Sequence, residues 1–436
     1  MSEYRLPSNW CWKKLSDIAT FIGGIGYDKN DICADGLRVL RGGNIQDGRL
    51  ITKKDDVFLP MTYDNDQNRI QIGDTCIAAS TGSVELLGKA ATCFEDLGNT
   101  HIGAFLRIIR PKRDDYALFI SALLQTDYYS SYIQRKCKGT SINNVRADML
   151  ADFTFPFPPE DELPLISNVY GVLTRKILLN QKNNDTLQAM VRQLYDYWFV
   201  QFDFPDENGM PYKLSGGKMV WDEKLKKEIP IGWETLSIND LTTSCRGVSY
   251  DSSQVSDIMT PENDILVLRG NNINNNNIVL DSNTAYISSS LVSLDQHIRR
   301  HDIIMTMSSG SKDHLGKCGM FQFDSNHTFG AFLSKYTPRK DYHYYVFSFL
   351  TSDWYKAKIK SICNGTGINN LTNENFNQIL LPAPPEKYIR LFNELVSASF
   401  DRIGENEKQN EILCKRRDEL LPLLLSGQVS VKRLSE

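Results

Sequence analysis

The sequence predicts a mixed α/β (α+β) fold built twice in tandem, in which two similar domains are each followed by a long helix. Three observations predict this class: a long internal repeat, an irregular order of strand and helix signals within each copy, and a heptad pattern in each tail. The chain has 436 residues, which at roughly 100–200 residues per domain leaves room for two or three domains. Hydrophobic residues make up 41% and charged residues 23%, the balance of a globular protein.

The repeat spans nearly the whole chain. Trp10 returns as Trp233, Arg41 as Arg269 and Gly103 as Gly330, so the offset stays between 223 and 228 residues. The segments of the first copy that return in order are residues 6–10, 39–45, 80–83, 88–89, 103–106, 139–144 and 156–160. Solenoid repeats are only about 20–50 residues long. The pattern therefore indicates two folded copies related by approximate two-fold symmetry, and duplex DNA is the commonest partner of that symmetry.

The front part of each copy mixes strands and helices. Residues 73–79 and 301–307 are predicted to be buried strands that enter a Gly-Ser turn. Residues 115–132 and 341–360 are predicted to be aromatic-rich helices. Because the two kinds of element do not alternate regularly, we expect an irregular α+β domain.

The tail of each copy is predicted to be one long helix. The first opens after the proline stop at residues 156–159 and runs to about Phe199, and the second opens at Glu386. Heptad positions fall at residues 166, 173, 180, 187 and 194 with 170, 177, 184, 191 and 198, and at 392, 399, 406, 413 and 420 with 396, 403, 410, 417 and 424. Apolar residues dominate these positions, which favours a coiled coil. About 40 residues at ~1.5 Å each make a helix of ~60 Å.

Four asparagines interrupt these apolar seams: Asn180, Asn184, Asn406 and Asn410. If the helices run antiparallel, the asparagines meet near the centre. A buried asparagine lowers stability but fixes register, because slippage would leave its amide unpaired. We therefore predict an antiparallel helix pair that holds the two mixed domains apart, and expect that replacing Asn184 and Asn410 by leucine raises thermal stability while loosening the register.

These signals divide the chain into six parts. The linker is rich in glycine and proline and is expected to be an irregular return path. The parts are a first domain at residues 1–158, a central helix at 159–200, the linker at 201–227, a second domain at 228–385, a C-terminal helix at 386–425 and a tail at 426–436.

Charge and cysteine usage restrict the function classes. The net charge is −4, and the first domain has 19 basic and 19 acidic residues against 14 and 15 in residues 226–385. DNA contact would then use a small organised basic face, or a partner subunit would supply much of the phosphate contact. An uncharged run of ~18 apolar residues is absent, so we expect no membrane association. Nine scattered cysteines without a CxxC pair or an export signal favour the cytoplasm.

Candidate DNA-binding residues are basic or polar groups, many of which recur in both copies. Arginine reads guanine through two hydrogen bonds and asparagine reads adenine. The candidates are Arg41, Asn44, Ser83, Lys89 and Lys138 in the first copy and Arg269, Asn272, Ser311, Lys317 and Lys335 in the second. The alternative interpretation is that matched residues only hold turns. The stretches that diverge between the copies, 44–63 against 272–286 and 84–103 against 312–330, are better candidates for sequence specificity.

Three segments of the sequence partly match known catalytic or metal-binding motifs, but each lacks a required residue. Residues 82–89 have five residues between their glycines, where a Walker A phosphate loop has four, and Ala90 replaces the magnesium-binding serine or threonine. The glycine-rich residues 21–26 are similar to the glycine motif of an adenine methyltransferase. Such an enzyme also needs an Asp/Asn-Pro-Pro-aromatic motif, which is absent. His297 and His301 are four apart, but a third metal ligand is not evident. We therefore predict no catalytic residue and no metal site.

Taken together, the duplicated order resembles the specificity (S) subunit of type I restriction–modification enzymes. The resemblance rests on a Pro-x-x-Trp opening, a Gly-Ser turn, a Gly-Thr…Asn turn and a Pro-x-Pro-Pro-Glu helix start, each present twice. It extends to residues 198–204 and to the closing residues 423–427, and so covers essentially the whole chain.

This resemblance implies a non-catalytic subunit with two target-recognition domains, each reading half of an asymmetric bipartite sequence in double-stranded DNA. The helices would act as a ruler for the spacer and would dock two methyltransferase (M) subunits. Two restriction (R) subunits would complete the complex in a prokaryotic cytoplasm. S-adenosylmethionine, ATP and Mg²⁺ would be bound by the partner subunits and not by this chain.

Two other function classes stay open at this point. One is a stand-alone DNA-modifying enzyme, either a nuclease or an adenine methyltransferase, which would turn over DNA without partners. The other is a coiled-coil assembly protein with no role on DNA. It would leave a host's methylation pattern unchanged when residues 1–158 are exchanged.

Overall fold

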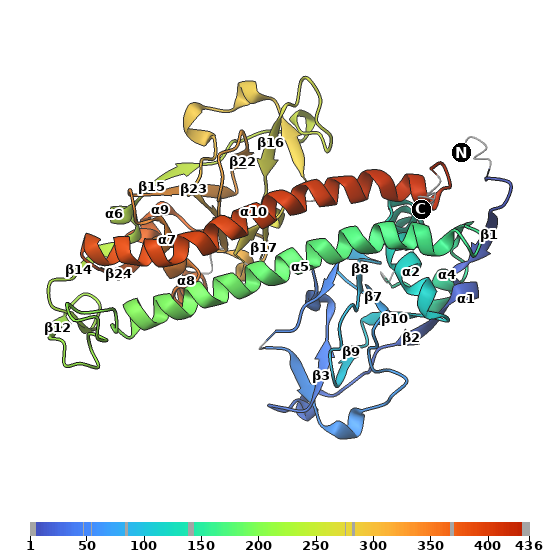
Figure 1. Ribbon diagram of the computed structural model, residues 1–436, viewed down its shortest axis with the longest axis horizontal. Helices are drawn as coiled ribbons and strands as arrows, with labels where there is room; N and C mark the ends of the chain where they lie inside the picture. Colours follow the sequence, from blue (N-terminus) through green and yellow to red (C-terminus); the bar gives the residue numbers. More distant parts are fainter. Residues whose placement is uncertain are drawn as a thin grey trace, which may run out of the picture. The chain divides into compact units, whose positions relative to one another are not determined.

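The computed structural model divides into two compact units (Figure 1). It describes residues 6–429 except 47, 54, 83–85, 138–143, 275, 281–283 and 367–369, and no side chain at 364–366. The first unit comprises residues 1–178 and 416–436, and the second comprises residues 179–415. Each unit therefore contains a mixed domain together with parts of both long helices. In the part of the chain that the structure describes, we find no helix long and apolar enough to cross a membrane.

The mixed domain of the first unit contains eleven strands and four short α-helices among the described residues. A four-stranded sheet has the order β2-β10-β7-β8, and a three-stranded sheet has the order β6-β3-β9. The strands are β1 (Cys11–Lys14), β2 (Ala19–Gly23), β3 (Leu37–Leu40), β4 (Ile45–Gln46), β5 (Arg49–Leu50), β6 (Val57–Leu59), β7 (Thr75–Ala78), β8 (Ala90–Thr92), β9 (Thr100–Ile102), β10 (Leu106–Pro111) and β11 (Thr154–Phe157). The helices are α1 (Leu15–Ile18), α2 (Ala117–Leu123), α3 (Asp127–Cys137) and α4 (Ala147–Ala151).

The mixed domain of the second unit repeats this topology. Its sheets have the orders β15-β23-β20-β21 and β19-β16-β22, and β14 pairs with β24 as β1 pairs with β11. The strands are β14 (Glu234–Ser237), β15 (Thr242–Arg246), β16 (Ile265–Leu268), β17 (Ile273–Asn274), β18 (Asn277–Ile278), β19 (Ala285–Ile287), β20 (Ile303–Thr306), β21 (Cys318–Met320), β22 (Thr328–Phe329), β23 (Leu333–Pro338) and β24 (Leu380–Ala383). The helices are α6 (Ile238–Leu241), α7 (His343–Leu350), α8 (Asp353–Thr366) and α9 (Asn373–Asn377). The predicted duplicated α+β fold is confirmed.

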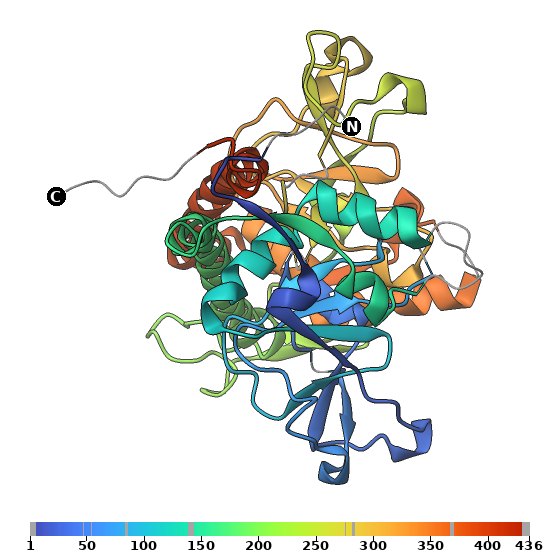
Figure 2. The same ribbon diagram turned by 90° about the vertical axis from the view of Figure 1, so that its right-hand side faces the viewer.

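Each four-stranded sheet lies between a helical layer and the three-stranded sheet (Figures 1 and 2). Side chains alternate across a strand, so Ile77 of β7 packs into the core with the helices while Cys76 and Ala78 pack into the core with Leu40 of β3. In the second unit Ile303 and Met305 face the helical core and Ile304 faces the other core. The predicted buried strands at residues 73–79 and 301–307 are confirmed.

The predicted aromatic helices are each broken in two. The first is α2 followed by α3, and the second is α7 followed by α8. At each break a hydroxyl accepts a hydrogen bond from a backbone N–H of the next helix: Thr126 Oγ1 from Tyr129 and Ser352 Oγ from Tyr355, both at 3.2 Å. Such caps begin a new helix, and for this reason the prediction of one continuous helix in each copy was wrong.

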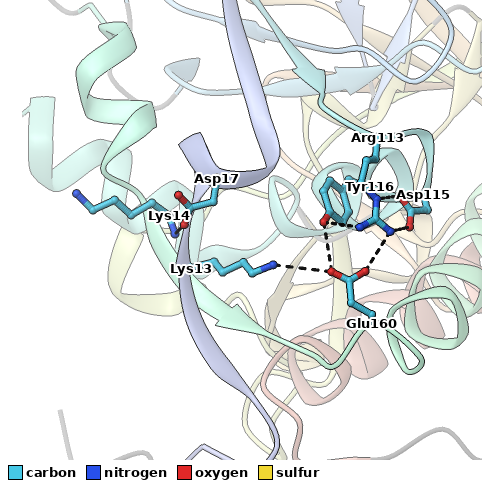
Figure 3. A network of polar contacts seen from close by, with 7 residues as sticks. All are labelled: Lys13, Lys14, Asp17, Arg113, Asp115, Tyr116 and Glu160. Carbon is cyan, nitrogen blue, oxygen red and sulfur yellow. Dashed lines mark hydrogen bonds and ion pairs between the residues drawn. The ribbon is translucent and has the colours of Figure 1, made fainter.

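The first long helix, α5 (Leu163–Tyr195), continues into a π-helical turn at Asp196–Val200. A polar cluster fixes the segment that leads into it (Figure 3). Arg113 Nη2 lies 3.1 Å from Glu160 Oε2, the Tyr116 hydroxyl donates to Glu160 Oε1 at 3.4 Å, and Lys13 Nζ lies 4.0 Å from the same oxygen. Glu160 therefore ties β1 and the segment before α2 together ahead of the helix.

The second long helix, α10 (Glu386–Leu425), runs antiparallel to α5 within the second unit. Asn406 Nδ2 donates to Asn184 Oδ1 at 2.7 Å, and Asn180 Nδ2 donates to Asn410 Oδ1 at 2.9 Å. The predicted pairing of asparagines across an antiparallel seam is confirmed. The partners are 184 with 406 and 180 with 410, so replacing Asn184 together with Asn410 would break both pairs and is not the right test.

The segment between the copies is more ordered than predicted. β12 (Met219–Asp222) and β13 (Lys227–Pro230) form an antiparallel hairpin. Phe204 stacks on Trp233 with ring centroids 5.1 Å apart. Apolar residues in this segment therefore attach it to the core of the second unit.

Candidate nucleic-acid interface

In the first unit, segments that match between the copies meet in one place. The backbone N–H groups of Ala79 and Ser80 donate to the carbonyl oxygen of Phe105 at 2.9 and 3.0 Å, and Gly103 N–H donates to Leu40 O at 2.8 Å. Ser80 also forms an isolated β-bridge with Asn144. We define the first loop cluster as residues 41–44, 80–82, 103–105 and 144.

The second unit assembles the equivalent cluster with nearly the same bonds. Met307 and Ser308 N–H donate to Phe332 O at 2.9 and 3.1 Å, and Gly330 N–H donates to Leu268 O at 2.9 Å. The Ser308 hydroxyl lies 2.5 Å from Asn370 Oδ1. The second loop cluster is residues 269–272, 308–311, 330–332 and 370. Segments up to 103 residues apart in the sequence (41 to 144) thus form one surface in each unit.

A close approach of two backbones holds each cluster in place. A Cβ on Gly24 would lie 2.0 Å from the carbonyl oxygen of Gly103, and one on Gly247 would lie 2.2 Å from that of Gly330. Real Cβ atoms do not come this close to a backbone oxygen, so only glycine fits at either position. Within the glycine-rich residues 21–26, this packing explains the glycine at position 24.

The matched Arg-Gly-x-Asn segments form 3₁₀ turns, Gly42–Asn44 and Gly270–Asn272. Asn44 and Asn272 are buried, and their Oδ1 atoms accept from the backbone N–H of Arg41 and Arg269 at 2.7 and 2.9 Å. Their Nδ2 groups donate to the carbonyls of residues 51 and 279. These bonds favour the turn-holding interpretation of both asparagines over base reading. Arg41 is exposed and Arg269 is half-buried.

Lys335 does not join the second loop cluster. It is buried, its Nζ lies 3.4 Å from Asp302 Oδ2, and it donates to His297 O at 2.8 Å. The charge of Lys335 therefore neutralises a buried carboxylate, which is a structural role.

Three other candidates lie on the surface. Lys89, Ser311 and Lys317 are exposed, and Lys317 Nζ lies 3.0 Å from His314 Nδ1. Burial, with the neighbouring positive charge of Lys317, lowers the pKa of His314, which favours its neutral form near pH 7. The remaining candidates, Ser83 and Lys138, lie outside the described residues.

Sequence reasoning did not select two exposed aromatic residues of the clusters. The side chains of Phe105 and Phe332 are 67% and 69% exposed. The signal was present in the repeat, because a large apolar residue occupies the same position of a turn in both copies. Among the described residues, no group of three or more histidine, cysteine or acidic side chains could hold a metal ion.

These features define a class of protein: a duplicated chain that presents two equivalent loop surfaces, one in each unit. Residues 7–189 match the family model of the type I restriction modification DNA specificity domain. The type I restriction enzyme MjaIX specificity subunit of Methanocaldococcus jannaschii is 22% identical, covering 99% of this chain and 96% of its own. The EcoKI specificity subunit of Escherichia coli is 28% identical, covering 47% of this chain and 45% of its own.

The solved structure of the S subunit of a type I restriction–modification system from M. genitalium matches this chain with a TM-score of 0.48 at 15% identity, covering 97% of this chain and 98% of its own. By the sequence matches the chain is similar, over nearly its whole length, to the specificity subunits of type I restriction–modification systems.

Proposed function

We propose that this chain chooses the DNA target of a type I restriction–modification complex. Each mixed domain reads one half of an asymmetric bipartite sequence in duplex DNA. One observation carries the proposal: the matched segments assemble the same loop surface in both units of one chain. Two such surfaces suit two half-sites, since a pseudo-symmetric reader binds half-sites in a fixed spacing.

The proposed DNA contacts combine matched and divergent residues. Arg41, Lys89, Ser311 and Lys317 are exposed and keep their proposed roles, with Ser83 and Lys138 as further candidates. Exposed basic groups contact phosphates and position the protein, whereas base-edge contacts specify the sequence. The divergent loops 44–63, 84–103, 272–286 and 312–330 are therefore the proposed source of base specificity.

The proposed partners supply the chemistry. The long helices dock two M subunits and set the half-site spacing, two R subunits complete the complex, and the assembly works in a prokaryotic cytoplasm. The M and R subunits bind S-adenosylmethionine, ATP and Mg²⁺, while this chain itself catalyses no reaction. The antiparallel seam supports a ruler role because its asparagine pairs fix one register.

A genome-wide map of N6-methyladenine tests the proposal. Long-read sequencing would compare hosts that carry the neighbouring methyltransferase gene with and without this gene. We expect one bipartite motif to gain methylation only when this chain is present. If no motif depends on the chain, and the purified chain with its methyltransferase binds no DNA sequence selectively, the proposed function is wrong.

Two variants sharpen the test against the other function classes. Exchange of residues 1–158 for another first domain should change one half-site and leave the other intact, whereas a coiled-coil assembly protein would leave the pattern unchanged. Deletion of one heptad from each helix should change only the spacer. Turnover of DNA by the isolated chain would instead indicate a stand-alone enzyme.

A further inference from the structure

The turns that carry Phe105 and Phe332 point an aromatic ring into solvent in both units. Single exposed apolar residues are ordinary, but here two copies with many divergent loops retain phenylalanine at one equivalent position. Their side chains are 67% and 69% exposed. The next residues, Leu106 and Leu333, are 1% and 0% exposed. Each turn thus anchors a leucine in the core and presents the preceding ring outward.

Backbone bonds fix the main chain that carries each ring. Leu106 N–H donates to Gly103 O at 2.9 Å and Leu333 N–H donates to Gly330 O at 2.8 Å, which closes each turn. The carbonyl of each phenylalanine accepts two further N–H groups from the Gly-Ser loop. A ring on a fixed main chain loses only its own side-chain freedom on contact with a partner.

The surroundings of the rings favour DNA as that partner. The exposed Arg41 side chain lies against Gly103, two residues before Phe105, since a Cβ on Gly103 would be 3.8 Å from Arg41 Cγ. Arg269 directly follows Leu268, whose carbonyl binds Gly330. A cation for the phosphate backbone beside an aromatic ring for the bases is the usual combination in nucleic-acid binding.

We propose that Phe105 and Phe332 are sequence-independent base contacts, each inserting its ring at a base-pair step of the half-site that its own domain reads. The inference rests on the proposed function and deepens it. The two domains would read different bases, so a residue common to both suits a contact that tolerates any sequence. Aromatic rings meet this need because every base has a π-face, and apolar side chains are known to insert between base steps.

The test measures DNA affinity of the complete complex of this chain with its methyltransferase subunits, on an oligonucleotide that carries the mapped target. Loss of one base–aromatic contact should weaken binding by about 5- to 100-fold. We expect this loss for Phe105→Ala and for Phe332→Ala, and recovery for Phe→Trp at each site. Ile72→Ala and Leu294→Ala remove other side chains that are 66% and 83% exposed and serve as controls that should bind normally.

Two further readouts separate a base contact from a structural role. An uncharged contact should leave the slope of log affinity against log salt unchanged, whereas Arg41→Ala should reduce the slope by about 1. The fluorescence of 2-aminopurine placed along each half-site should rise on binding at the inserted step. That rise should disappear with the alanine variant of the corresponding domain.

The outcomes distinguish this inference from the proposed function. If the wild-type complex binds its target selectively and both alanine variants bind equally well, the base contact is rejected. It is also rejected if the variants lose methyltransferase subunits in proportion to lost affinity, because the rings would then be protein contacts. If the wild-type complex shows no sequence selectivity, the proposed function itself fails and this inference fails with it.

Discussion

Each unit contains a buried aspartate at an equivalent position, but a different residue neutralises its charge in each. Asp74 and Asp302 occupy equivalent positions before β7 and β20, are 1% and 2% exposed, and accept a backbone N–H from three residues earlier at 2.8 Å. In the first unit Arg110 Nη2 lies 2.8 Å from Asp74 Oδ2. In the second unit the cation is Lys335, with Nζ 3.4 Å from Asp302 Oδ2.

The two cations come from different positions of the repeat. Residue 337 corresponds to residue 110, and there Thr337 donates its hydroxyl to Asp302 Oδ1 at 2.5 Å. Residue 335 corresponds to residue 108, where the first unit has a fully buried isoleucine. A buried carboxylate needs a partner charge, but the geometry of the strand pair lets either of two positions supply it. Duplication has therefore preserved the neutralised carboxylate and not the residue that neutralises it.

The largest expected effect comes from removing the second cation. Lys335→Ile should destabilise the second unit by about 3–5 kcal/mol, because Asp302 would remain buried without its charge partner. Adding Thr337→Arg recreates the first unit's arrangement and should restore most of the loss. Urea unfolding measures both variants, with the exposed Lys340→Ile as a control expected to change little. If the double variant is as unstable as the single one, the two positions are not interchangeable.

The same comparison shows what the sequence could predict. The strands at residues 73–79 and 301–307 and the asparagine seam depend on local periodicity, which is visible in the sequence. Lys335 was predicted to contact DNA because it is basic, but its partner Asp302 lies 33 residues earlier and only tertiary packing joins them. Asn44 was likewise selected by residue type, and its burial depends on bonds formed in the folded loop.

The assembly of the loop clusters could not be predicted from the sequence. The repeat identified segments that include residues 41–44, 80–82 and 103–105, but not that these residues meet, since their contacts depend on the sheet orders β2-β10-β7-β8 and β6-β3-β9. The two exposed rings were missed because residues that contact DNA were expected to be polar or basic. A hydrophobic residue in a turn, present in both copies, was the signal that could have found them.

An intermediate effect is expected at the helix seam of the second unit. Asn184→Leu should cost about 2 kcal/mol, because the buried Asn406 amide would lose its acceptor. Replacing both asparagines by leucine should recover this loss and stabilise the pair beyond wild type, since two apolar side chains then meet in an apolar seam. A double-mutant cycle by thermal unfolding checks the coupling, and additive effects of the two substitutions would contradict the pairing. Asn180→Leu with Asn410→Leu provides the matched second pair.

The smallest expected effect concerns another equivalent pair of positions. The first unit has Gly73 against Ala117, where a Cβ on the glycine, at φ +92°, would lie 3.2 Å from the alanine Cβ. In the second unit His301, at φ +70°, stacks on His343 with ring centroids 3.8 Å apart and an interplanar angle of 4°. Arg300, Asp302, Asp324, Tyr344 and Asp401 surround this pair.

Burial, with His301 and Arg300 nearby, lowers the pKa of His343 to about 3, and burial lowers that of His301. An unfolded histidine has a pKa of about 6.5, so below that pH the unfolded chain binds more protons. The contribution of these two histidines to the free energy of unfolding is complete above pH 6.5 and is lost as the pH falls toward 3. We expect the second unit to lose about 1 kcal/mol between pH 7 and pH 5 from this pair, after discounting its partial exposure.

The first unit supplies the residues that should abolish this acid sensitivity. His301→Gly with His343→Ala installs the first unit's pair, relieves the left-handed φ of a non-glycine residue and removes both titrating rings. Unfolding free energies from pH 8 to pH 5 should then decline less steeply by about 1 kcal/mol, while His297→Gln leaves the stacked pair and its acid sensitivity in place. An unchanged decline in the double variant would show that the stacked rings do not control the acid response, and that the two units differ here in packing alone.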